Sequence, residues 1–309
     1  MATPANAATD SALPATVAGR AQTGASRQAR MGRLARRNPL MVAGAVLLIL
    51  LVLAAIFAPL IAPADPLQTG FSTRVRPPAI LGFESAFLLG SDNLGRDILS
   101  RLLYGGRISL ALAAIAVVVS ATIGVVLGLI SGYFGGVIDD VIQRVVDVQL
   151  SFPIIMLAIA VIAAVGASEG ALVGVLVLAG WVIYTRTVRA SVLSIKHQEF
   201  VQAARALGAG DTRIITRHIL PNVVAPIIVV ATVQVATMIL LESGLSFLGL
   251  GVQPPTPSWG TMLADGRDYL SNAWWISTIP GVAISLVVLS ANMLGDGLRD
   301  VLDPNLRNL

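Results

Sequence analysis

Long apolar runs separated by shorter polar segments dominate this chain of 309 residues. Each run is long enough to cross the hydrocarbon core of a bilayer, which takes roughly 20 residues of α-helix. The pattern therefore predicts an all-α membrane protein with about six transmembrane helices. We expect them near 40–62, 107–131, 141–166, 170–190, 223–250 and 275–296.

The first run follows a tail of different composition. Residues 1–38 are rich in Ala, Thr, Ser and Gly and become basic towards their end. We expect a disordered tail, followed by a membrane domain over 39–309. A cleaved signal peptide is the alternative, because Ala-Pro-Ala at 62–64 resembles a cleavage site. The run 40–62 is ~35 Å long as a helix, which favours a membrane span over a signal core of ~7–15 residues.

Two features indicate how the spans contact one another. Asp140, Arg144 and Asp147 recur on one helical face at the start of the third run, where they can pair with each other or with a neighbouring helix. We favour ion pairs at the end of a span over a place in a transport path. Gly124 and Gly128 form a GxxxG pair in the second run, which permits tight packing within this chain or against another.

The most informative polar segment is residues 199–222, here called the island, which separates the fourth and fifth runs. A seventh span here is unfavourable, because each charge near the centre of a membrane helix costs ~2.5–3.5 kcal/mol. The charged residues in the island and just before it are Lys196, Glu199, Arg205, Asp211, Arg213 and Arg217.

Two short amphipathic helices are expected in the island. Phe200, Ala204 and Leu207 recur at helical spacing in the first helix, with polar residues on another face. An apolar face exposed on a loop requires a partner. The island is therefore predicted to bind another protein.

A hinge is expected between these two helices. Gly208 and Gly210 end the first helix, and the side chain of Asp211 can cap the second. The second helix has its apolar side at Ile215 and Ile219.

Composition narrows the function further. Hydrophobic residues make up 55% of the chain and charged residues 12%, about half the roughly 25% of globular proteins. The lack of cysteine excludes disulfides and cysteine-ligated metals. The net charge of +4 is spread along the membrane edges rather than gathered in one basic patch, so nucleic acid is not expected as a partner.

The placement of Arg and Lys orients the chain. With the N-terminus inside, fifteen of the 21 basic residues lie on the cytoplasmic side and six lie outside. Both termini and the island are therefore expected in the cytoplasm. Segments 63–106 and 251–275 are expected outside the membrane on the opposite face.

The segment 63–106 is expected to be irregular in its proline-rich first half. Its second half, from Gly90, predicts a helix that Ser91, Asp92 or Asn93 can cap. This helix either lies at the outer surface or leads into the second span.

The segment 251–275 contains Trp259, Trp274 and Trp275. Because tryptophan prefers the headgroup layer, we favour an interfacial position for this segment. A partly re-entrant loop near a transport path is the alternative.

The sequence contains none of the nucleotide-binding, catalytic or metal-binding motifs for which we searched. Lys196 is the only lysine and lies between Ile195 and His197, so the chain has no Gly-Lys-Ser/Thr of a P-loop. His197 and His218 are 21 residues apart and belong to no HExxH motif. We expect no metal site and no enzyme activity in this chain.

The island resembles the EAA loop of binding-protein-dependent ABC importer permeases. That pattern is Glu-Ala-Ala, three residues, Gly, nine residues, an aliphatic residue, one residue and Leu-Pro. Gln202 stands where Glu is expected, and His218 stands at the usual Ile position. The positions in register are Ala203, Ala204, Gly208, Leu220 and Pro221.

Three further segments narrow the resemblance to the peptide/opine/nickel group, and within it to the C-type subunit of dipeptide and oligopeptide permeases. They are LGSDNLGRDILSRLLYGGRISL from Leu89, ESGLSFLGLGVQPPTPSWG from Glu242 and GDGLRDVLDPNLR from Gly295. The resemblance covers roughly residues 30–309 and implies the type I ABC importer permease fold.

The resemblance also implies partners and a site. They are a second homologous permease, two ATP-binding subunits that hold ATP and Mg, an extracytoplasmic binding protein and a peptide substrate, in the bacterial cytoplasmic (inner) membrane. This chain itself would hold no cofactor. Its EAA loop would dock on an ATPase and pass motion through the hinge to the fourth and fifth spans. The residues implied in ATPase coupling are Glu199, Gln202, Ala203, Ala204, Leu207, Gly208, Leu220 and Pro221.

Glu242 lies inside the fifth apolar run, where a carboxyl group must be paired, hydrogen-bonded, protonated or facing water. One hypothesis places Glu242, Ser243 and Phe247 in the pathway or its outer gate, where the carboxylate meets a peptide amino group. The alternative is a helix–helix hydrogen bond with Ser243 or with the partner permease.

Other functions remain open at this point. The same scaffold is compatible with nickel or an opine-like solute. A stand-alone secondary transporter would require inverted repeats and ionisable groups at the midplane, and no repeat is evident. A scaffold or sensor would explain the island but not Glu242 and the elaborate outer segments.

Overall fold

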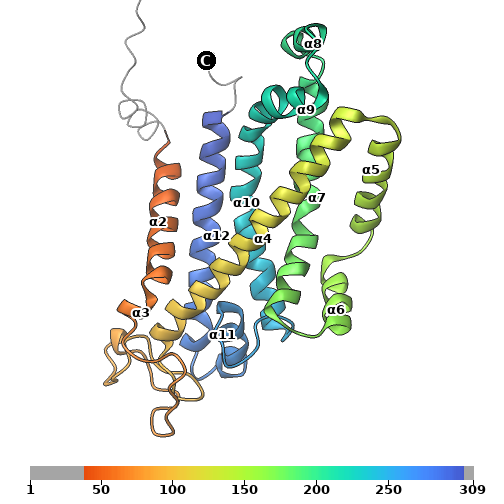
Figure 1. The fold of residues 1–309 in the computed structure, drawn as a ribbon. Helices are drawn as coiled ribbons and strands as arrows, with labels where there is room; N and C mark the ends of the chain where they lie inside the picture. Colours follow the sequence, from red (N-terminus) through yellow and green to blue (C-terminus); the bar gives the residue numbers. More distant parts are fainter. Residues whose placement is uncertain (1–37, 303–309) are drawn as a thin grey trace, which may run out of the picture. The chain divides into compact units, whose positions relative to one another are not determined.

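A computed structural model describes residues 38–302, and the regular elements in this part of the chain are helical (Figure 1). The expected disordered tail lies outside the described residues, apart from Asn38. Five described helices are long and apolar enough to cross a membrane. They are α2 (Pro39–Ile56), α4 (Ile98–Phe134), α7 (Glu169–Ile195), the continuous helix Asp211–Phe247 and α12 (Trp275–Leu302). The all-α prediction is confirmed.

The third apolar run is broken rather than straight. It forms α5 (Gly136–Leu150) and α6 (Ile154–Val165), which are bent by 90°. Pro153 precedes α6 with extended backbone angles, and proline has no N–H to continue a helix from α5. The count becomes six spans, as predicted, if this bent pair crosses the membrane as one unit.

The helix predicted from Gly90 leads directly into the second span. Its cap is Asp97, whose carboxylate accepts a hydrogen bond from the Ser100 N–H at 2.7 Å, so the prediction of a cap at 91–93 was wrong. Asp92 instead closes a tight loop by accepting from the N–H groups of Leu94 and Arg96. The helix thus begins only after this loop ends.

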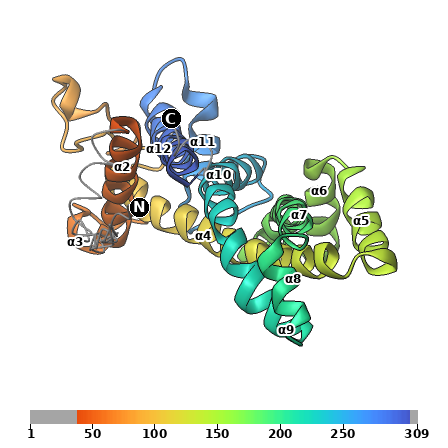
Figure 2. The ribbon, with the colours of Figure 1, turned by 90° about the horizontal axis from the view of Figure 1, so that it is seen from above.

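Four helices contribute most of the main hydrophobic core. They are α4, α7, α10 (Leu220–Phe247) and α12. The most extensive contact joins α4 to α7, while α10 contacts α4, α7 and α12. Figure 2 shows α2 at one edge, beside α12, and α5 at the other edge. At one end lie α3 (Ala58–Ile61), α11 (Trp259–Gly266) and short turns at Ala79–Leu81 and Arg267–Tyr269; α8 (Glu199–Ala206) lies at the other (Figure 1).

The GxxxG pair packs within this chain. A Cβ atom on Gly124 would lie 2.4 Å from the carbonyl oxygen of Trp181, and one on Gly128 would lie 2.8 Å from that of Thr185. Both oxygens belong to α7. The two glycines therefore allow α4 and α7 to approach backbone to backbone.

Among the charges of α5, Asp139 and Asp147 pair with the neighbouring helix, while Asp140 and Arg144 form no ion pair among the described residues. Asp147 accepts from Arg186 at 2.8 Å, and Asp139 binds both Nε and Nη2 of Arg189 at 2.6 and 2.5 Å. Both arginines are on α7. These pairs hold the bent segment against α7 at the island end of the molecule.

Two of the three tryptophans of segment 251–275 are buried within the protein. Trp259 is 3% exposed and its indole N–H donates to the Leu102 carbonyl at 2.9 Å. Trp275 is 7% exposed and donates to the Ser91 carbonyl at 3.2 Å. Their indole N–H groups therefore have partners inside the protein, and the interfacial position of the segment stays a prediction.

Candidate functional site

The first island helix and its glycine stop are as predicted. The helix α8 ends at Ala206, and Gly208 follows with φ +80°, a conformation that residues with a Cβ rarely adopt. Gly208 is exposed, and an added Cβ would meet no atom within 4 Å. Backbone conformation, not crowding, is therefore the local reason for glycine here.

The second island helix is not separate from the fifth span. It comprises α9 (Asp211–Ile214) and a π-helical turn (Ile215–Ile219), which continue without interruption into α10. Gly210, not Asp211, is the residue at the N-cap position. Pro221 cannot donate a backbone hydrogen bond, and its ring crowds the preceding turn, so the wider turn before it accommodates the proline.

The buried side of the island rests on the ends of α4 and α7. Val201, Ile214 and Ile219 are fully buried in a small core of their own. The α4 and α7 side chains in that core are Leu129, Tyr133, Val188 and Val192. Three apolar anchors thus fix the base of the island to two spans.

The opposite side of α8 and the turn that follows it are exposed, and they carry most of the predicted coupling residues. Leu207 is 88% exposed and Phe200 is 41% exposed, although both are large and apolar. Of the residues implied in coupling, Ala204 and Leu220 are partly buried. The exposed ones are Glu199, Gln202, Ala203, Leu207, Gly208 and Pro221.

Hydrogen bonds also attach the island, and the residue Lys196 just before it, to the last turn of α4. Tyr133 donates its hydroxyl proton to Asp211 Oδ1 at 2.5 Å, and Arg205 Nη2 donates to the Tyr133 oxygen at 3.3 Å. Lys196 donates to the Gly132 carbonyl at 2.9 Å. Tyr133 was not among the residues predicted from the sequence. The available signal was an aromatic residue with a polar tip just before the helix-ending pair at 135–136.

The second candidate group surrounds Glu242 at the other end of the molecule. This side chain is fully buried, and its carboxylate accepts from Ser246 at 2.8 Å and from Ser243 at 3.3 Å. The hydroxyls of Ser109 on α4 and Ser258 before α11 also face the carboxylate. These serines bring α4, α10 and the start of α11 together around one acidic group.

Two of these serines also accept hydrogen bonds from backbone N–H groups of the segment 251–275. Ser246 accepts from the Val252 N–H at 3.2 Å, and Ser109 accepts from the Trp259 N–H at 3.2 Å. Phe247 lies next to the cluster along the chain and is partly buried. A pathway or gate role for Glu242, Ser243 and Phe247 stays a prediction, and the observed contacts correspond to the hydrogen-bonding alternative.

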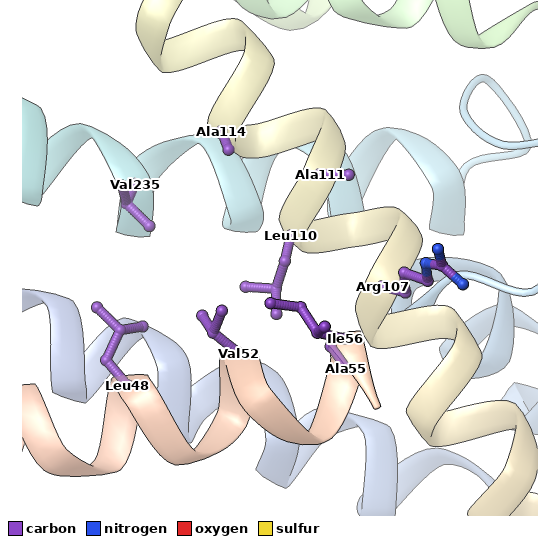
Figure 3. A pocket seen from close by; sticks show the side chains of 9 residues that line it. All are labelled: Leu48, Val52, Ala55, Ile56, Arg107, Leu110, Ala111, Ala114 and Val235. Atoms are coloured by element: carbon purple, nitrogen blue, oxygen red, sulfur yellow. The ribbon is translucent and has the colours of Figure 1, made fainter. Parts of the chain in front are cut away.

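An apolar groove between α2, α4 and α10 is the third feature (Figure 3). It has a volume of about 450 Å³, and Arg107 is its one charged lining residue. Its walls are otherwise Leu48, Val52, Ala55, Ile56, Leu110, Ala111, Ala114 and Val235. Such a surface suits lipid or another helix better than a zwitterionic solute.

Comparison with known families identifies this architecture. The model described as "Binding-protein-dependent transport system inner membrane component" matches residues 124–308, which include the island and Glu242. The chain belongs to this permease family. A second model, the N-terminal TM domain of oligopeptide transport permease C, matches residues 29–78.

Curated relatives cover nearly the whole permease. The di/tripeptide transport system permease protein DppC of Pseudomonas aeruginosa is 43% identical over 266 residues, 86% of this chain and 88% of the relative. The dipeptide transport system permease protein DppC of Escherichia coli is 45% identical over 273 residues, 88% of this chain and 91% of the relative. The family resemblance inferred from the island is confirmed.

A solved structure supports the fold of this permease. A chain from inward-facing structures of the MetNI methionine ABC transporter superposes with a TM-score of 0.55 at 19% identity. The match covers 66% of this permease and 96% of that chain. The predicted type I ABC importer permease fold is thus confirmed, and a stand-alone secondary transporter is not supported.

We expect Glu242→Gln to retain transport within about twofold of the parent permease, because serine hydroxyls can donate or accept and so can bond an amide. Glu242→Leu should instead leave buried hydroxyls unpaired, at about 1–3 kcal/mol for each. Thermal unfolding in detergent and uptake in proteoliposomes measure the two effects. Equal damage by both substitutions would show that the negative charge itself is required.

Proposed function

We propose that this permease imports di- or oligopeptides and that the island receives its motion from an ATPase subunit. The proposal that an ATPase docks here rests on one observation. Apolar side chains are exposed at the tip of the island, although the apolar side chains at its base are buried. Leu207, which directly follows α8, is 88% exposed at the tip of the island, whereas Val201 on α8 is fully buried. An anchored helix with an unpaired apolar tip is the arrangement expected of a protein-docking element.

The remaining partners follow from the same proposal. A second permease completes the pathway, two ATP-binding subunits hold ATP and Mg, and an extracytoplasmic binding protein delivers the solute. The protein lies in the bacterial cytoplasmic membrane with the island and both termini in the cytoplasm, as the distribution of Arg and Lys indicates. Peptide as substrate is supported by the names of two relatives that match 86–88% of this chain.

Uptake by the reconstituted assembly tests the proposal. Proteoliposomes containing both permeases, the ATPases and the binding protein should accumulate a radiolabelled Ala-Ala dipeptide only when ATP is supplied. Competition by longer peptides and by a nickel chelate would rank the solute classes. Uptake without ATP, or uptake of the chelate in preference to any peptide, would contradict the proposal.

The docking step has its own prediction. Leu207→Glu should prevent the ATPases from co-purifying with the permease pair, because a charge replaces the most exposed apolar side chain of the island. Leu270→Glu is the matched control, since Leu270 is 55% exposed but lies in the segment 251–275 at the other end. Retention of the ATPases by Leu207→Glu would contradict docking at this surface.

A further inference from the structure

The last turn of α4 is the point where the two parts of the island meet a span. Arg205 is in the last turn of α8, and Asp211 is the first residue of α9. Between them lie Gly208, with φ +80°, and Gly210. A Cβ on either glycine would meet no atom within 4 Å, and Ala209 is the residue between them that packs against the small core.

Tyr133 contacts both sides of this turn. Its hydroxyl donates to the Asp211 carboxylate at 2.5 Å and accepts from the Arg205 guanidinium at 3.3 Å. The Arg205 guanidinium also lies over the Tyr133 ring, 5.8 Å from its centroid. One phenol group therefore links a cation on α8 to an anion on α9, and hydrogen bonds to charged groups are stronger than neutral ones.

The Tyr133 ring is as firmly held as its hydroxyl. Tyr133 is 8% exposed and belongs to the small core that contains Val201 of α8 and Ile214 of α9. Its neighbour Gly132 accepts from Lys196 at the end of α7. The preceding Ser131 donates to Asp139 of α5 at 2.5 Å. The tyrosine thus stands on a helix end that is itself fixed on two further sides.

We propose that Tyr133 is a positioning residue that holds α8 and α9 in one arrangement across the glycine turn and passes the displacement of α8 to α4. This inference rests on the proposed docking of the ATPase on α8. Without the phenol hydroxyl, α8 can move on the ATPase while α9 and α4 stay behind, so ATP hydrolysis and transport become uncoupled.

The length of α4 gives this link a consequence at the other end of the molecule. The helix runs 37 residues from the island to the segment that holds α11. There Ser109 of α4 accepts from the Trp259 N–H, and Ser109 also faces Glu242. A displacement received at Tyr133 can therefore reach the serine cluster through one continuous helix, in addition to the route through α7 and α10.

Tyr133→Phe tests the proposal because it removes one oxygen and keeps the ring in the small core. We expect the assembled importer to keep its ATPases and to hydrolyse ATP, while Ala-Ala transported per ATP falls about tenfold, the effect of losing one hydrogen bond to a charged group. Tyr184→Phe is the matched control, since the buried Tyr184 hydroxyl on α7 has no hydrogen-bond partner among the described residues. It should behave like the parent.

A second measurement is independent of the solute. The chain has no cysteine, so nitroxide labels can be placed at Ala206 on α8 and Thr212 on α9 of the full assembly. The distance distribution between them should broaden in Tyr133→Phe and stay narrow in Tyr184→Phe. Adding Tyr133→Phe to Asp211→Ala should cause no further loss of transport per ATP, because both changes break the same link.

The outcomes separate this inference from the docking proposal. An unchanged distance distribution with unchanged transport per ATP in Tyr133→Phe would overturn the positioning role. Loss of the ATPases from this variant would overturn it too, since Tyr133 would then belong to the docking surface or the fold. If Leu207→Glu retains the ATPases, docking on α8 is wrong whatever Tyr133→Phe does.

Discussion

Replacing Gly208 with aspartate is expected to reduce transport to background while the chain still inserts into the membrane in normal amounts. The substitution places a charge next to Leu207, on the exposed surface that we propose binds the ATPase. It also puts a side chain on a residue with φ +80°. Membrane abundance, ATPase co-purification and uptake, measured together, separate a docking defect from a folding defect.

We expect docking, not folding, to be the step that fails in Gly208→Asp. The left-handed conformation costs a residue with a Cβ roughly 1–2 kcal/mol, and aspartate tolerates it better than most. A Cβ at Gly208 meets no atom of this chain within 4 Å. This cost is small beside a typical folding free energy of about 5–15 kcal/mol, so the chain should fold.

Gly210→Asp provides a matched control two residues away. Gly210 also has open space around it, but its backbone is extended, and it occupies the N-cap position of α9. Aspartate is favoured at an N-cap, so this variant should keep its uptake. Gly208→Asn tests the charge, since it fills the same space without one. Parental uptake by Gly208→Asp would show that the ATPase does not contact this turn.

The membrane architecture was predictable because it depends on local composition. A run of about 20 apolar residues has few stable alternatives to a membrane helix, so the spans could be placed before any contact was known. The break in the third run was harder to predict, although Pro153 lies inside it. Prolines also lie within α10 and α12, at Pro226 and Pro280, and those helices continue. Whether a proline ends a helix depends on what packs around it, and composition does not contain that information.

The candidate site was predictable only in part, for a similar reason. The glycine stop at Gly208 and the exposed face of α8 follow from local spacing and were correctly located. The partner of Asp211 is Tyr133, 78 residues earlier, and this contact replaced the predicted cap. Likewise, the surroundings of Glu242 are supplied by serines on other elements, such as Ser109. Long-range partners of this kind leave no periodic signal in the sequence.

The largest effect on folding is expected from Gly124→Leu, which should prevent the chain from accumulating as a folded assembly. A Cβ at this position would lie 2.4 Å from the Trp181 carbonyl oxygen and 2.5 Å from the Tyr184 Cβ. The first of these is backbone, so it cannot rotate away, and α4 must separate from α7 to make room. That pair has the most extensive helix contact in the described part of the chain.

Separation of α4 from α7 would also disturb the island. Both helices contribute to the small core beneath it, through side chains such as Leu129 on α4 and Val188 on α7. Overpacking of a rigid core typically costs about 1–3 kcal/mol, and a clash with backbone lies at or above the top of that range. We therefore expect loss of transport together with rapid proteolysis of the chain in membranes, unlike the docking defect of Gly208→Asp.

Gly174→Leu is the matched control for this prediction. Gly174 is also a glycine inside a helix of the same pair, on α7, but a Cβ there meets no atom within 4 Å. Leucine in place of glycine improves helix propensity by about 1 kcal/mol, so this variant should be at least as resistant to proteolysis as the parent. A stable Gly124→Leu chain would mean that α4 and α7 are not held together at this crossing. A Gly174→Leu chain that folds but loses its second permease would instead place that partner on the open face of α7.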